Sequence, residues 1–97
     1  MNHISIDKLL EKRNHEKIYI IDIRQPIEYS RGYIPGSKNI PAQRLLLDPA
    51  YYLDKNKTYY LYCHSGHTSN NVSNRLNGLG YNTVNIDGGY NNYLLMK

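Results

Sequence analysis

Apolar residues occur along the chain in short runs separated by turn-forming residues, a spacing typical of strands alternating with helices. The three longest strand-like runs cover residues 17–22, 59–62 and 82–86. The first is almost continuously apolar, as expected for a strand buried on both faces of a parallel sheet. His3-Ile4 predicts a short edge strand, and residues 38–40 predict a brief strand that the following proline ends.

Amphipathic segments lie between these runs and predict helices. Ser5 is placed to cap a helix that has Ile6, Leu9 and Leu10 on one face. Thr68 or Ser69 is expected to cap the longest helix, which Gly80 ends and whose apolar stripe comprises Val72, Leu76 and Leu79. Further helical segments are predicted after Pro26, at residues 42–47, at residues 50–53 beyond a break at Asp48-Pro49, and after the Gly88-Gly89 pair.

Strands that alternate with short helices imply right-handed βαβ units, so the fold is predicted to be α/β, with a mostly parallel sheet and helices on both faces. Residues 1–97 are enough for one domain and too few for two. The loops at residues 22–24, 63–69 and 87–89 each follow a strand. Because the carboxyl ends of parallel strands meet at one edge of a sheet, we expect these three loops to surround one mouth.

Composition and charge narrow the classes of function. The net charge of +4 comes from lysines and arginines dispersed along the chain, which predicts a solvated surface rather than a nucleic-acid site. A modest positive field still favours small anionic substrates. One cysteine forms no internal disulfide, and no apolar run approaches the roughly eighteen residues that a membrane span needs. The start lacks a signal-like segment, so we expect a soluble, cytoplasmic protein with no membrane partner.

The single cysteine, Cys63, ends the strand at residues 59–62 and begins a loop with turn chemistry at Ser65-Gly66. One interpretation is a small buried residue that only packs, because free cysteine is among the most buried residue types. The favoured interpretation is a reactive thiol, since backbone N–H groups converge at such a loop and stabilise a thiolate. Gly66 is expected to have a positive φ or a close backbone approach that brings these amides toward the sulfur.

Three stretches stand out as a set: Asp22-Ile23-Arg24 continuing to Ile34-Pro35-Gly36-Ser37-Lys38-Asn39-Ile40-Pro41, the cysteine loop, and Asp87-Gly88-Gly89-Tyr90. Together they resemble the rhodanese (sulfurtransferase) family. The resemblance implies a small doubly wound sheet of five parallel strands. It also implies that Cys63 takes a sulfane sulfur from thiosulfate or a persulfide, becomes a persulfide, and passes the sulfur to cyanide or a thiol.

The resemblance further implies the partners and the residues that bind them. The partners are a small anionic sulfur donor and a thiol or cyanide acceptor, with a persulfide-carrying protein as a further candidate, and no metal or cofactor is expected. Family members active on thiosulfate often have a fixed cation in the loop, whereas this loop has only histidines. We therefore expect a high KM for thiosulfate at neutral pH. The predicted substrate-binding residues are His64, Ser65, Gly66, His67, Thr68, Ser69 and Arg24.

Several alternatives compete with this interpretation. Cys63, His64 and His67 could form a metal site, although a loop whose amides converge on sulfur turns its side chains outward. Arg24 could contact an anion or only pair with Asp22, and the pairing is slightly favoured. A cysteine-dependent phosphatase needs an arginine to clamp phosphate at the position of Ser69. A non-catalytic rhodanese-like binding module is the third possibility, and His3 and His15 are expected to be surface residues.

Overall fold

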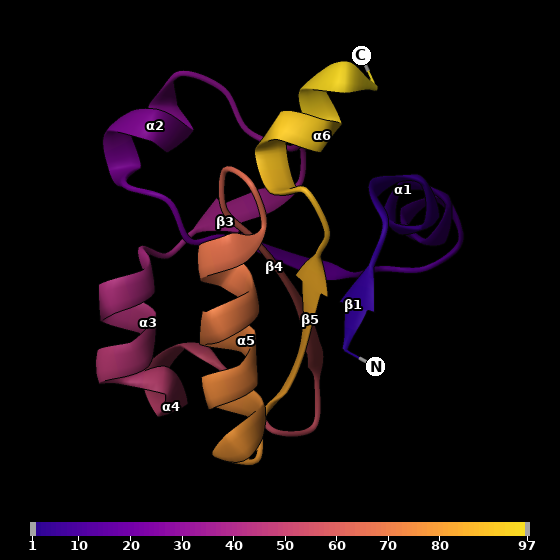
Figure 1. The fold of residues 1–97 in the computed structure, drawn as a ribbon. Coiled ribbons are helices and arrows are strands. Elements are labelled where there is room, and N and C mark those ends of the chain that lie inside the picture. Colours follow the sequence, from indigo (N-terminus) through magenta and orange to yellow (C-terminus); the bar gives the residue numbers. More distant parts are fainter. Residues whose placement is uncertain (1, 97) are drawn as a thin grey trace.

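The computed structural model describes residues 2–96, which form one five-stranded parallel sheet with helices on both faces (Figure 1). The strand order is β1-β5-β4-β2-β3, so the strand that ends at Cys63 lies in the centre. Every neighbouring pair is parallel, which confirms the predicted small, doubly wound α/β sheet. The strands are β1 His3–Ile4, β2 Tyr19–Asp22, β3 Ser37–Asn39, β4 Thr58–Tyr62 and β5 Asn82–Ile86.

The helices are α1 Ile6–His15, α2 Pro26–Ser30, α3 Ala42–Leu47, α4 Pro49–Tyr52, α5 His67–Gly78 and α6 Gly89–Leu95. Helices α1 and α6 contact each other on one side of the sheet, and α3, α4 and α5 cover the other side (Figure 1). Helix α2 lies toward the same end of the molecule as α6 and the cysteine loop. Within residues 2–96, no helix combines the length and the hydropathy needed to cross a bilayer.

The central strand β4 and Cys63, which directly follows it, contribute alternate side chains to two separate cores. Tyr59, Leu61 and Cys63 belong to the core under α3 and α5, whereas Tyr60 and Tyr62 belong to the core under α1. This alternation follows from the two-residue period of a strand. It directs the Cys63 side chain toward the face that α5 covers.

The helix caps confirm one prediction and contradict another. Ser5 caps α1, because its Oγ accepts a hydrogen bond of 3.3 Å from the Lys8 amide. Helix α5 instead begins at His67 with Gly66 as its N-cap, so the predicted Thr68 or Ser69 cap is wrong. The Ser69 side chain is fully buried and hydrogen-bonds inside the protein, and it is therefore not available at the helix end.

Several element boundaries also differ from the sequence prediction, and among the strands β2 begins at Tyr19 rather than at residue 17 and β4 begins at Thr58 rather than at residue 59. Leu79 is the C-cap of α5 and is 56% exposed, so its assignment to the apolar stripe is wrong. Gly80 comes directly after this cap, with the positive φ of +96° that suits a glycine closing a helix. The predicted break at Asp48-Pro49 is confirmed, since α3 ends at Leu47, but α4 covers Pro49–Tyr52 rather than residues 50–53 because a proline needs no N–H in the first turn. Strand β3 begins and ends one residue earlier than predicted.

Candidate active site

The Cys63 sulfur lies under the loop that joins β4 to α5 and is surrounded by hydrogen-bond partners. Its residue is only 6% exposed. Sγ accepts hydrogen bonds from the backbone amides of Gly66 at 3.2 Å and Ser69 at 3.3 Å, and the thiol is 3.3 Å from Ser69 Oγ. Two amides aimed at one sulfur are donors that stabilise a negative charge formed on it.

Gly66 allows the loop to adopt this shape. Its φ is +95°, in the left-handed region that side chains disfavour. A Cβ atom at this position would lie 2.9 Å from the Gly88 nitrogen, closer than real Cβ contacts. The predicted positive φ and close backbone approach at Gly66 are both confirmed.

The junction between β5 and α6 supports the cysteine loop from the other side. Gly88 and Gly89 have φ values of +74° and +56°. This turn lets the first amides of α6 reach the loop, where Tyr90 N donates to the Cys63 carbonyl at 2.8 Å and Asn91 N donates to the His64 carbonyl at 2.9 Å. A Cβ atom on Gly89 would overlap the Cys63 carbonyl oxygen. The glycine pair is therefore needed for close packing against the loop.

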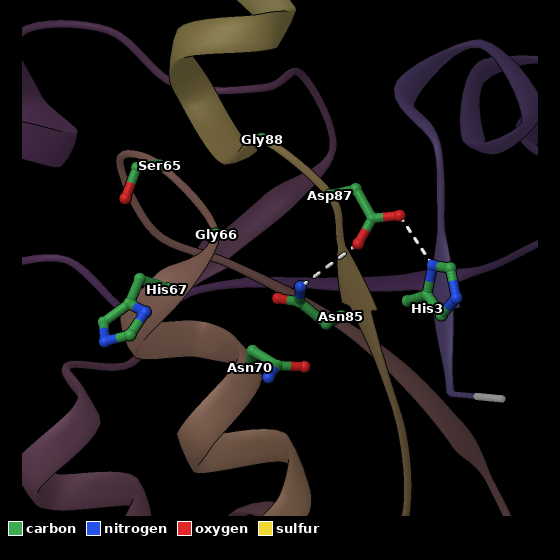
Figure 2. A pocket seen from close by; sticks show the side chains of 8 residues that line it. All are labelled: His3, Ser65, Gly66, His67, Asn70, Asn85, Asp87 and Gly88. Atoms are coloured by element: carbon green, nitrogen blue, oxygen red, sulfur yellow. Dashed lines mark hydrogen bonds and ion pairs between the residues drawn. The ribbon is translucent and has the colours of Figure 1, made fainter.

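The other predicted loop residues lie at the exposed rim. His64, Ser65, His67 and Thr68 are all exposed, and among these Ser65 and His67 line an open pocket of about 520 Å³ (Figure 2). His64 Nε2 forms a hydrogen bond with Glu28 Oε2 from α2. This hydrogen bond lowers the pKa of Glu28, so a carboxylate remains at the mouth. The sequence contained no local signal for this pair.

Arg24 is buried and forms an ion pair, which was one of the two alternatives considered for it. Its guanidinium contacts the Asp22 carboxylate at 2.6 Å, donates to the Gly32 carbonyl at 2.7 Å, and lies 4.2 Å from the centre of the Tyr90 ring. Burial opposes its charge, but the hydrogen bond and negative charge of Asp22 outweigh burial and raise the pKa of Arg24. Arg24 also borders a pocket of about 250 Å³ that includes Glu28 and His64.

The histidines of the described chain do not gather around Cys63. In residues 2–96, no group of three His, Cys, Asp or Glu side chains lies close enough to hold a metal ion. His3 and His15 are exposed as predicted, although His3 is paired with Asp87. Two polar residues near the cysteine were not predicted as site residues. They are Asn85, whose Oδ1 accepts a hydrogen bond of 2.5 Å from the Ser69 hydroxyl, and Asp87 beside it.

Comparison with known proteins assigns the chain to a family. Residues 5–95 match the model of the Rhodanese-like domain. YtwF of Bacillus subtilis is 37% identical over 90 residues, covering 92% of this chain and 86% of the relative. Thiosulfate sulfurtransferase PspE of Escherichia coli is 32% identical over 78 residues, covering 79% of this chain and 75% of the relative. A crystal structure of a rhodanese-like domain protein from Staphylococcus aureus superimposes with a TM-score of 0.88 at 34% identity, covering 96% of this chain and 91% of that one. The chain therefore belongs to the rhodanese-like family.

Proposed function

We propose that this protein is a rhodanese-type sulfurtransferase in which Cys63 carries the transferred sulfur. The observation that carries the proposal is the single cysteine of the chain, at the end of the central strand, with its sulfur facing the amides of Gly66 and Ser69. The names of relatives such as PspE support sulfur transfer in general. The classes of donor and acceptor are those that the resemblance to the family implies.

The reaction proceeds in two displacements. The Cys63 thiolate attacks the sulfane sulfur of the donor, the bond to that sulfur breaks, and its electron pair leaves with sulfite from thiosulfate or with a thiolate from a persulfide. Cys63 then carries a persulfide with a negative outer sulfur. In the second step a thiolate or cyanide attacks the outer sulfur, the S–S bond breaks, and the Cys63 thiolate is restored. Neither step needs a cofactor.

The residues around the sulfur have separate roles in this scheme. The amides of Gly66 and Ser69 stabilise the anionic sulfur, as fixed donors do for a charge that develops in a transition state. The exposed side chains of His64, Ser65, His67 and Thr68 contact the donor at the rim. Arg24 holds the nearby loop by donating to the Gly32 carbonyl, while Asp22 neutralises its charge.

The charge at the mouth favours one class of donor. His64 is the residue nearest the position of the missing loop cation, and Glu28 already pairs with it. A dianion such as thiosulfate meets the carboxylate of Glu28, whereas a monoanionic persulfide is repelled less. We infer that the preferred donor is a persulfide, either small or carried by a protein. A reducing compartment such as the cytoplasm keeps a lone thiol available for this reaction.

The test is to incubate the purified protein with thiosulfate or with glutathione persulfide and to measure the intact mass and the cyanolysable sulfur. We expect a gain of one sulfur atom, because the chain has one cysteine. Cys63→Ser should gain none, and His15→Ala, at an exposed position on α1, should behave as wild type. No sulfur on Cys63 with either donor would refute the proposal. Hydrolysis of p-nitrophenyl phosphate under the same conditions would indicate a phosphatase instead.

A further inference from the structure

A continuous chain of hydrogen bonds leads from the Cys63 sulfur to the protein surface. The first links are buried, since Ser69 is 0% and Asn85 is 4% exposed. Beyond them the side chains of Asp87 and His3 reach the pocket shown in Figure 2. The links are Sγ to Ser69 Oγ at 3.3 Å, Ser69 Oγ to Asn85 Oδ1 at 2.5 Å, Asn85 Nδ2 to Asp87 Oδ1 at 3.4 Å, and Asp87 Oδ2 to His3 Nδ1 at 2.6 Å.

The carboxylate of Asp87 determines the direction of the inner bonds. An ionised carboxylate only accepts, so Asn85 turns its NH₂ group toward Asp87 and its oxygen toward Ser69. His3 occupies the other carboxylate oxygen and limits rotation of Asp87. This orientation of the Asn85 amide presents an acceptor to Ser69.

The Ser69 hydroxyl can donate one hydrogen bond, and three neighbouring atoms could accept it. Asn85 Oδ1 is at 2.5 Å, whereas the Gly66 carbonyl and the Cys63 sulfur are both at 3.3 Å. The Ser69 hydroxyl therefore donates its hydrogen bond to Asn85, and a lone pair of the hydroxyl oxygen faces the sulfur. A Cys63 thiol donates to this lone pair, but a thiolate receives no hydrogen bond from it.

We propose that Asn85, Asp87 and His3 are positioning residues that keep the Ser69 hydroxyl proton away from Cys63. The inference rests on the proposed function, in which Cys63 is the nucleophile. A thiolate held by two amides and no hydroxyl is more basic than one with three donors, and it is also more nucleophilic. The chain of bonds thus lowers the fraction of thiolate and raises the reactivity of each thiolate.

Asn85→Leu tests the proposal without changing any charge and with little change in volume. Iodoacetamide alkylation of Cys63 is measured against pH by intact mass. With its acceptor removed, the Ser69 proton turns to the sulfur, and the pH of half-maximal alkylation should fall by about 0.5 to 1 unit. The limiting alkylation rate at high pH should fall about two- to threefold, because a less basic thiolate is also less nucleophilic. Asn70→Leu, at an exposed position lining the same pocket, should change neither value.

A double-mutant cycle shows whether the effect passes through the hydroxyl. In a Ser69→Ala background, Asn85→Leu should shift the alkylation midpoint by less than about 0.2 unit. Asp87→Asn frees the Asn85 amide to turn and also removes a charge, so it should lower the midpoint more in wild type than in Ser69→Ala. The other charged or titratable groups around the loop are His64, His67, Glu28 and the Asp22–Arg24 pair, and they are unchanged throughout.

Equal shifts in the two backgrounds, or no shift from Asn85→Leu in wild type, would overturn the proposal. If Asn85→Leu does not fold, Asp87→Asn still decides, because the Asp87 side chain is 46% exposed and tolerates substitution better. Alkylation needs no sulfur donor. A protein that fails to accept sulfur therefore refutes the proposed function without affecting this test.

Discussion

Replacing Gly66 with alanine tests whether the loop backbone holds its amides on the Cys63 sulfur. Gly66 has a φ of +95°, and a Cβ atom there would lie 2.9 Å from the Gly88 nitrogen. Gly36 has nearly the same φ, +91°, but its Cβ atom would meet nothing within 4 Å. Comparison of the two alanine variants therefore separates backbone strain, which both share, from displacement of the loop, which only Gly66→Ala causes.

The magnitudes follow from this geometry. Alanine in the left-handed region costs about 1–2 kcal/mol, partly offset by the lower entropy of the unfolded chain, so Gly36→Ala should lose about 1 kcal/mol of unfolding free energy. Gly66→Ala must also displace the backbone at Gly88 and should lose about 2–3 kcal/mol. The same displacement moves the Gly66 amide away from the sulfur, now at 3.2 Å. A hydrogen bond to a charged group contributes about 1.5–3 kcal/mol, so sulfur acceptance should slow about tenfold to a hundredfold.

Two measurements check these values. Urea unfolding gives the free energy of unfolding, and cyanolysable sulfur after short exposure to glutathione persulfide gives the rate of sulfur acceptance. Gly36→Ala should accept sulfur at the wild-type rate while being slightly less stable. If Gly66→Ala stayed within about twofold of wild type, or if both variants slowed equally, the loop amides would not act as argued.

Three further predictions concern packing and charge. Leu45→Ala should lose about 2–5 kcal/mol of unfolding free energy by urea denaturation, and Leu47→Ala less than about 0.5, because the two leucines are 0% and 87% exposed. Glu28→Gln removes the carboxylate that pairs with His64, so the thiosulfate KM at neutral pH should fall about two- to fivefold with kcat little changed. An unchanged KM would contradict the charge argument. Burial raises the pKa of Tyr62, so the protonated phenol should stabilise the fold fully below about pH 10 and less above it. Between about pH 9 and 11, the free energy of unfolding should therefore decline less in Tyr62→Phe than in wild type.

The order and type of the elements could be predicted from the sequence because their signals are local. The apolar run before Asp22, the tyrosine-rich run before Cys63 and the glycines after them each specify strand, turn or helix within a few residues. The parallel arrangement then places the three loops at one edge without further information. A local signal failed at Ser69, whose side chain resembles a helix cap but bonds to Asn85, a residue 16 positions away.

The pairs around the site could be determined only from the tertiary structure. His3 and Asp87 are 84 positions apart and meet because β1 adds to β5 at the edge of the sheet. Glu28 reaches His64 because α2 lies at the same end of the sheet as the cysteine loop. The physical reason is that hydrophobic periodicity specifies which face of a strand is buried but not which strand lies beside it. Strand order comes from how the helices cover both faces, and only that order brings these distant side chains into contact.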